Sequence, residues 1–146
     1  MQFTKAEEYG MLGVLYLAEK EQGLVTPLSE ISEAQEIPEK FLAKIFQSLS
    51  RTGIVRSHRG VRGGFTLAKD PAEISIKDVL ESIHGPYHLV KCMDDTGICK
   101  KTDYCALKEL LQIAEDKLVA ILVEHSLADL VDWEKKHKAG AQVDVK

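Results

Sequence analysis

The chain has 146 residues, of which 45% are hydrophobic and 29% are charged. This composition fits one compact globular domain, or a small domain with an appendage, and excludes a disordered or collagen-like chain. The net charge is −4, yet segment 38–69 carries seven Lys and Arg residues and only Glu39 as an acid, so this segment has +6 and the remainder −10. Such a distribution directs an anionic partner to one patch, although a merely solvated basic face is the alternative.

The ends and the cysteine count narrow the class of protein further. The first residues, MQFTKAEEYG, lack the basic and apolar regions of a signal peptide, and no segment offers the roughly 18 apolar residues of a membrane span. We therefore expect a cytoplasmic protein without membrane contact. The three cysteines are an odd number, and a chain of this length does not need disulfides to stabilise its core.

Three helices are predicted before any strand. The first spans about 4–20 with Thr4 as its N-cap, and the second runs from Thr26-Pro27, where the threonine would cap the helix, to about Ala34. The third begins at Ile37-Pro38 and ends before Gly53, a C-cap signal. Its predicted buried face consists of Phe41, Leu42, Ile45, Phe46 and Leu49.

A hairpin and a fourth helix are predicted next. Two short strands, 54–58 and 65–68, flank the glycine-rich basic turn 59–64. Ser75 then opens a helix through a capping box with Asp78, and Gly85-Pro86 ends it. Three helices followed by a basic hairpin predict a winged helix-turn-helix, a fold that is mostly α with a small β-hairpin wing.

The C-terminal part is predicted to be helical. A loop of nearly twenty residues carries all three cysteines and leads into a long helix from Asp103 to about Glu124. A capping box at Ser126 begins a short closing helix. The polar tail after Trp133 is expected to be unstructured.

The third helix and the hairpin tip supply the candidate DNA-binding residues. With its apolar face buried, the helix leaves Lys40, Lys44, Gln47, Ser48 and Arg51 on the opposite face. Lys and Gln can read base edges in the major groove, whereas Arg51 near the helix end is expected to hold phosphate. Arg59 and Arg62 flank glycines that allow a tight turn, so either guanidinium could reach the minor groove, with Arg59 the first choice. An ordinary amphipathic surface helix and a plain exposed turn are the alternatives.

Cys92, Cys99 and Cys105 follow the spacing C-x6-C-x5-C. In a cytosolic protein, three thiols this close favour a metal over a disulfide. Structural zinc sites are expected to contain C-x2-C knuckles, which are absent here, whereas iron–sulfur clusters accept wider spacings from loops. The pattern therefore favours an iron–sulfur cluster, with a redox-switching disulfide or unrelated free thiols as alternatives.

Three thiolates leave one iron position without a cysteine ligand. A carboxylate or imidazole there is more labile, which suits a sensor. The candidates are Glu8 or Glu7 on the first helix, and His84 or His88 before the loop. Each has an ordinary alternative role, as an acid that complements the helix dipole or as an exposed histidine.

Particular stretches of the chain share a pattern with one family. They are MQFTKAEEYG at the start, IPEKFLAKIFQSLSRTGIVRSHRGVRGGFTLAKDP in the middle, and the three-cysteine loop before the long helix. The pattern is most specific at Leu-x-Arg-x-Gly-Ile-Val-x-Ser-x-Arg-Gly-x-x-Gly-Gly-Phe, which is Leu49 to Phe65. With these residues the chain resembles, over about residues 1–133, the Rrf-two family of winged-helix regulators, of the iron–sulfur and nitric-oxide sensing IscR/NsrR type.

The resemblance implies roles for particular residues. The first and third helices and the wing would touch operator DNA, the long helix would pair with its twofold mate, and the cysteines would hold a 2Fe-2S or 4Fe-4S cluster. The cluster-assembly branch uses a histidine three residues after the third cysteine, but Lys108 stands there and cannot serve. The nitric-oxide branch resembles this chain in having an acid at the position of Glu8, which can complete the cluster from the partner subunit. Ala43 replaces an acid of the cluster-assembly branch, so that branch's operator does not carry over.

We therefore predict a homodimeric transcription regulator that acts as a repressor and is not an enzyme. Its binding to a palindromic operator in double-stranded DNA would be controlled by the cluster, which would sense nitric oxide, redox state or iron–sulfur supply. Its expected organisation is a winged helix-turn-helix domain at 1–86, a cysteine cluster loop at 87–105, a dimerisation helix and short closing helix at 106–137, and a flexible tail at 138–146. The first alternative is a cluster-free regulator of the same family that responds through a thiol switch or a small effector. An electron carrier or enzyme would leave the basic segment unused, and phosphate-loop, HExxH and nucleophile-elbow motifs are absent from the sequence.

Overall fold

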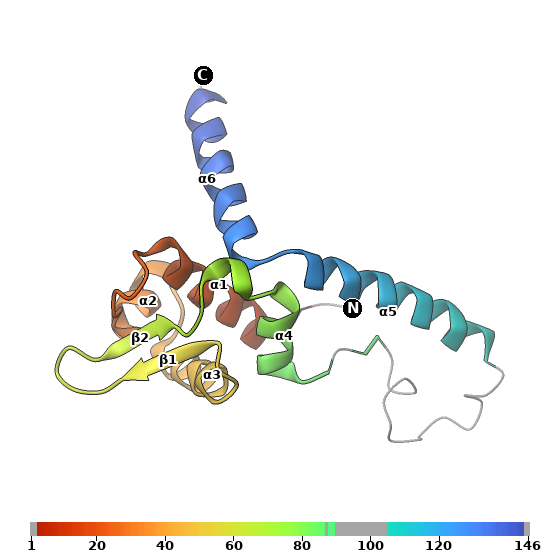
Figure 1. Ribbon diagram of the computed structural model, residues 1–146, viewed down its shortest axis with the longest axis horizontal. Helices are drawn as coiled ribbons and strands as arrows, with labels where there is room; N and C mark the ends of the chain where they lie inside the picture. The colour runs from red at the N-terminus through yellow and green to blue at the C-terminus, as the bar shows by residue number, and fades with distance from the viewer. Residues whose placement is uncertain (1–2, 87, 90–104, 145–146) are drawn as a thin grey trace.

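The computed structural model describes residues 3–86, 88–89 and 105–144, with side chains through residue 140. Its elements are α1 (Lys5–Glu19), α2 (Leu28–Gln35), α3 (Glu39–Arg51), β1 (Val55–His58), β2 (Gly64–Leu67), the short 3-10 helix η1 (Pro71–Glu73), α4 (Ile76–His84), α5 (Ala106–Glu124) and α6 (Leu127–Asp144). The helices α1–α4 and the hairpin pack together, and α5 and α6 leave this body in different directions (Figure 1). The mostly α fold with a β-hairpin wing is confirmed. Within the described residues, no helix has the length and apolarity needed to cross a membrane.

The core of the body forms where α1, α3 and α4 cross. Thr4 caps α1 as predicted, because the Glu7 N–H donates to Thr4 Oγ1 at 3.2 Å and the Thr4 N–H donates to Glu7 Oε1 at 3.3 Å. A Cβ at Gly13 would lie 2.7 Å from the Phe46 ring, so glycine lets α1 and α3 approach closely. The largest fully buried side chains are those of Phe46, Ile31, Leu42, Leu49, Ile74, Leu80 and Leu127.

The expected cap of the second helix is wrong. Thr26 does not cap α2, whose N-cap is Pro27 without a side-chain hydrogen bond. Instead, the Thr26 N–H donates to the Phe65 carbonyl at 3.0 Å and the Phe65 N–H donates back at 2.9 Å. This bridge holds Thr26 extended beside β2, so its side chain is buried rather than turned onto the helix.

The third helix ends as predicted. Gly53 has φ of +82°, the Gly53 N–H donates to Ser50 O at 3.2 Å, and the Ile54 N–H donates to Leu49 O at 2.9 Å. These two bonds form a Schellman motif, and Leu49 and Ile54 are both buried beside it. The helix therefore stops where the wing must begin.

Phe41 is a correction to the predicted buried face of α3. Its side chain is 57% exposed and packs edge-to-face on Tyr9 of α1, with ring centroids 6.4 Å apart. The four remaining positions, Leu42, Ile45, Phe46 and Leu49, are buried and follow the i, i+3, i+4, i+7 spacing. Phe41 falls at the edge of that stripe, beyond the reach of the core.

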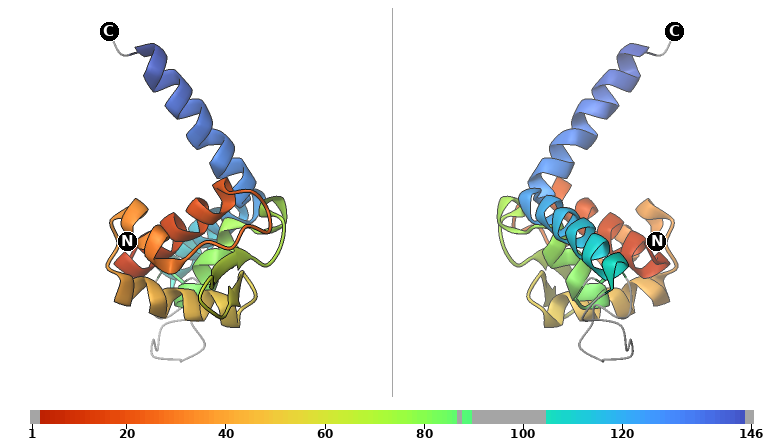
Figure 2. Two further views of the ribbon diagram at one scale, coloured as in Figure 1. Left: turned by 90° about the vertical axis from the view of Figure 1, so that its left-hand side faces the viewer. Right: turned by 90° about the vertical axis from the view of Figure 1, so that its right-hand side faces the viewer.

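The wing is a two-stranded antiparallel hairpin attached to α3. Val55 pairs with Leu67 and His58 pairs with Gly64. Phe65 of β2 packs edge-to-face on Phe46 of α3, with centroids 5.0 Å apart. The hairpin and α3 therefore lie side by side along one face of the body (Figures 1 and 2).

The closing helix α6 begins at its predicted cap but is longer than expected. The long helix α5 begins at Ala106 rather than at the predicted Asp103, which lies outside the described residues. Ser126 caps α6, because the Asp129 N–H donates to Ser126 Oγ at 3.2 Å. The helix continues to Asp144, so the prediction of a short helix and an unstructured tail is wrong about secondary structure. The segment after Trp133 contains strong helix formers such as Ala, Lys, Glu and Gln and no proline, which outweighs its polarity and Gly140. Lys138 Nζ of α6 also forms an ion pair with Glu19 Oε1 of α1 at 3.6 Å.

Candidate nucleic-acid interface and the cysteine segment

The polar face of α3 is exposed and basic. Lys40, Lys44, Gln47 and Arg51 occupy positions i, i+4, i+7 and i+11 and are all exposed, whereas Ser48 is half-buried. The opposite face of α3 is buried in the core, which fixes the position of the helix backbone that carries these side chains. None of the cations from Lys40 to Lys69 forms an ion pair within the described part of the chain. Their charge is therefore available to an anionic partner.

The hairpin tip presents two arginines on a constrained turn. The Gly63 N–H donates to Gly60 O at 2.9 Å, and Gly60 has φ of +110°, a conformation that favours glycine. Arg59 and Arg62 are both exposed on this turn, and Val61 between them is fully exposed. The tip is therefore exposed and cationic, a combination suited to a DNA groove.

A groove lies between α3 and the wing. It is lined by Gln47, Ser50 and Arg51 from α3 and by Ser57 and Phe65 from the wing. The structure thus brings Gln47 and Arg51 together with the hairpin. Ser50 and Ser57 were not among the predicted site residues, since exposed serines are common on any surface and carry no pattern of their own.

The predicted metal ligands are only partly within the described residues. Cys92 and Cys99 lie outside them, and Cys105 is the half-exposed N-cap residue of α5. Of the two glutamates on α1, Glu7 is 2% exposed and occupied by the Thr4 cap, whereas Glu8 is at the surface, 3.2 Å from Lys5. Among the described side chains no group of three or more His, Cys, Asp and Glu residues is arranged to hold a metal. Glu8 is thus the more available of the two carboxylates.

Glu115 is a buried polar residue of this region that the sequence interpretation missed. Its Oε1 lies 3.1 Å from His88 Nδ1, and its Oε2 accepts from the Leu89 N–H at 3.3 Å. Both His84 and His88 are exposed, but His88 contacts α5 through Glu115. No sequence signal could identify Glu115, since it is one of many acids on a helical pattern whose partners lie 26 and 27 residues away.

The surface of α5 carries an exposed apolar stripe. Leu107, Leu110 and Ile121 are 61%, 61% and 53% exposed. Positions 107, 110, 114, 117 and 121 are separated alternately by three and four residues, so they lie on one face of the helix. Lys117 is the polar member of this repeat. Such a stripe is typical of a helix that packs against another helix in an assembly.

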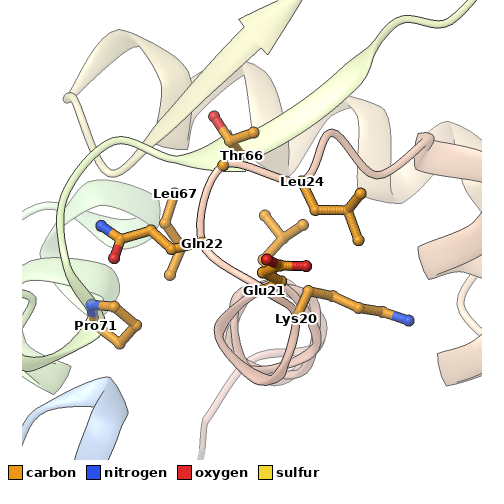
Figure 3. Close-up of a pocket in the computed structure, with 9 residues that line it drawn as sticks. Lys20, Glu21, Gln22, Leu24, Thr66, Leu67 and Pro71 are labelled. Atoms are coloured by element: carbon orange, nitrogen blue, oxygen red, sulfur yellow. The ribbon is translucent and has the colours of Figure 1, made fainter.

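A small cavity between the loop after α1 and the start of η1 is too small for an effector. It has a volume of about 20 Å³, which accommodates roughly one water molecule. Figure 3 shows Thr66 and Leu67 of β2 beside Lys20, Glu21, Gln22 and Leu24, which follow α1 and help to enclose the cavity. This cavity is a packing detail under the wing.

The comparisons with known proteins agree with this arrangement. The profile of the Rrf2 family, described as an iron-dependent transcriptional regulator, matches residues 3–133. Among solved structures, IscR of T. potens is 22% identical with a TM-score of 0.75, covering 94% of this chain and 90% of that one. CymR, the global cysteine regulator of B. subtilis, is 22% identical with a TM-score of 0.71, covering 91% and 98%. A Listeria innocua protein assigned as a transcriptional regulator is 29% identical with a TM-score of 0.75, covering 90% and 87%.

Proposed function

Because this chain belongs to the Rrf2 family of transcriptional regulators, we propose that it is a homodimeric repressor whose operator binding is controlled by an iron–sulfur cluster. The observation that carries the DNA-binding part is the shared face of α3 and the wing, with exposed cations on both and a groove between them. Lys40, Lys44 and Gln47 would read base edges, with Ser48 at the margin of the contact. Arg51 would hold phosphate, and Arg59 and Arg62 would enter the minor groove.

The dimer would form through α5. Its apolar stripe, Leu107, Leu110, Ala114 and Ile121, is exposed over most of the helix, which is about 28 Å long. A second copy of α5, antiparallel to the first, would cover this stripe and remove its apolar surface from water. Twofold symmetry then implies a palindromic operator with half-sites about one or two helical turns apart.

The cluster would be held by Cys92, Cys99 and Cys105, with Glu8 of the partner subunit as the fourth ligand. Cys105 supports this assignment because its thiol is half-exposed at the N-cap of α5, where it is accessible to an iron centre. When bound, the cluster supplies an iron centre that reacts with oxygen or nitric oxide. A change in the bonds of Cys105 would act on the first turn of α5 and so on the dimer.

A thiol switch without a cluster is the second candidate. Lys108, which cannot replace a histidine ligand, and the structural similarity to CymR favour it. Staphylococcus aureus CymR, which is 24% identical with a TM-score of 0.71, has been solved in an oxidised form. In this version the same cysteines would change the position of α5 by forming a disulfide.

Two measurements test these proposals. Anaerobically purified protein should be coloured, with iron and sulfide near stoichiometric amounts, and Cys99→Ala should lose the absorbance while remaining a dimer. A colourless wild-type protein that binds DNA with full affinity would favour the thiol switch. For the DNA interface, Arg51→Ala should weaken binding to all duplexes and lower the salt dependence by the equivalent of about one phosphate contact. Lys136→Ala, on exposed α6, is the matched control, and equal effects of the two changes would refute the assigned face.

A further inference from the structure

The buried side chain that α5 contributes is a carboxylate. Glu115 is only 6% exposed, and no other residue of α5 is as deeply buried. Leu107, Leu110 and Ile121, in contrast, are more than half exposed. Carboxylates are seldom buried unless they are paired, because they lose their hydration. The position of Glu115 therefore reflects its partners rather than hydrophobic packing.

Both oxygens of Glu115 are used, and both partners follow α4 directly. Oε1 lies 3.1 Å from His88 Nδ1, and Oε2 accepts from the Leu89 N–H at 3.3 Å. His88 comes four residues after α4 ends. The carboxylate thus ties the middle of α5 to the chain that follows α4, at the edge of the DNA-reading body, which consists of α1–α4 and the hairpin.

The second attachment of α5 lies at its C-terminal end. The Ile76 N–H donates to His125 O, and the Leu127 N–H donates to Ile74 O, each at 3.0 Å, while Leu122 packs against the core. Ten residues, about 15 Å of helix, separate Glu115 from this joint. A helix held only at the joint can tilt, and a tilt of roughly 10° would move the position of Glu115 by about 2.5 Å. α5 also contacts α4, and the Glu115 contacts add an attachment farther from the joint that restricts this tilt.

We propose that Glu115 is a positioning residue that sets the angle between α5 and the DNA-reading body, and thereby the operator spacing that the dimer accepts. The inference rests on the proposed function, since the angle matters for spacing only where two copies pair through α5. In a twofold dimer every change of the angle occurs in both subunits, so it changes the separation of the two α3 helices. Without the Glu115 contacts the angle between α5 and the DNA-reading body varies. Only a fraction of the dimers then has the two α3 helices at the separation that a given operator spacing requires.

The experiment measures spacing preference. Wild-type protein first selects its operator from a pool of random duplexes, and the selected sequence is then remade with one or two base pairs inserted or deleted at its centre. Glu115→Ala should lose about tenfold in affinity for the selected spacing, as expected if the matching angle falls to about a tenth of the population, and should discriminate less against the shifted spacings. Glu115→Gln should retain the wild-type preference, because its amide can still accept from Leu89 and donate to His88. Glu109→Ala, an exposed acid on the same helix, is the control.

Hydrogen exchange at the Leu89 amide gives a readout that does not depend on DNA. Exchange should be faster in Glu115→Ala and unchanged in Glu109→Ala. An unchanged Leu89 rate, or equal spacing preferences in Glu115→Ala and wild type, would overturn the inference. If wild-type protein selects no duplex, the proposed function itself is refuted, and the Leu89 comparison still decides whether the tie exists.

Discussion

Gly64→Ala offers a direct test of how the wing is attached to the body. A Cβ at Gly64 would collide with the Thr26 carbonyl, lying 2.5 Å from its carbon and 2.8 Å from Pro27 N. These are backbone atoms, so they cannot yield by a change of rotamer. The alanine can be accommodated only if β2 moves away from Thr26, which breaks the two hydrogen bonds between Thr26 and Phe65.

The expected cost follows from these contacts. Two hydrogen bonds contribute about 1–3 kcal/mol together, and forcing a methyl group into a packed site costs about 1–3 kcal/mol. We therefore expect the free energy of unfolding to fall by roughly 2–6 kcal/mol. DNA binding should also weaken, because Phe65 positions the wing against Phe46.

Urea unfolding followed by circular dichroism measures this change. Gly140→Ala is the matched control, because Gly140 lies in α6 with open space around its Cβ position, and alanine should stabilise that helix by up to about 1 kcal/mol. A Gly64→Ala protein whose stability is within about 0.5 kcal/mol of wild type would show that the bridge between Thr26 and Phe65 does not hold the wing.

Three further changes test the surfaces. Arg59→Ala should reduce operator affinity by about 1–3 kcal/mol in fluorescence anisotropy, mainly at A·T-rich positions, without changing the unfolding midpoint, and unchanged binding would remove the wing from the interface. Leu110→Glu should shift the protein toward monomer in analytical ultracentrifugation, since it places a charge in the apolar stripe; a persistent dimer would contradict pairing through this face. Glu134→Gln should raise Tm at pH 7 but not near pH 4, where wild-type Glu134 is itself protonated. The reason is that a hydrogen bond to Glu19 raises the pKa of Glu134. The protonated carboxyl therefore stabilises the fold at low pH, and this contribution is lost as the pH rises through the folded pKa. Equal Tm differences between variant and wild type at both pH values would refute this pairing.

The local structure of this protein follows from short-range signals in its sequence. Thr4, Ser75 and Ser126 cap their helices as predicted, and Gly53 ends α3, because each of these motifs is completed by residues within a few positions along the chain. The exposed basic face of α3 also follows from periodicity, because the helical repeat separates polar from apolar positions wherever one face is buried. The charge of the proposed DNA-binding surface could therefore be predicted.

Contacts between distant segments decided the rest. Thr26 pairs with a strand 39 positions later, Phe41 falls outside the reach of the core, and Glu115 is buried by residues that follow α4. Periodicity predicts that a helix has a buried and an exposed face, but it does not determine how wide the buried face is or which backbone groups contact a given side chain. The groove between α3 and the wing depends on such long-range contacts, and so does the angle between α5 and the body formed by α1–α4 and the hairpin. Only the tertiary structure could therefore determine them.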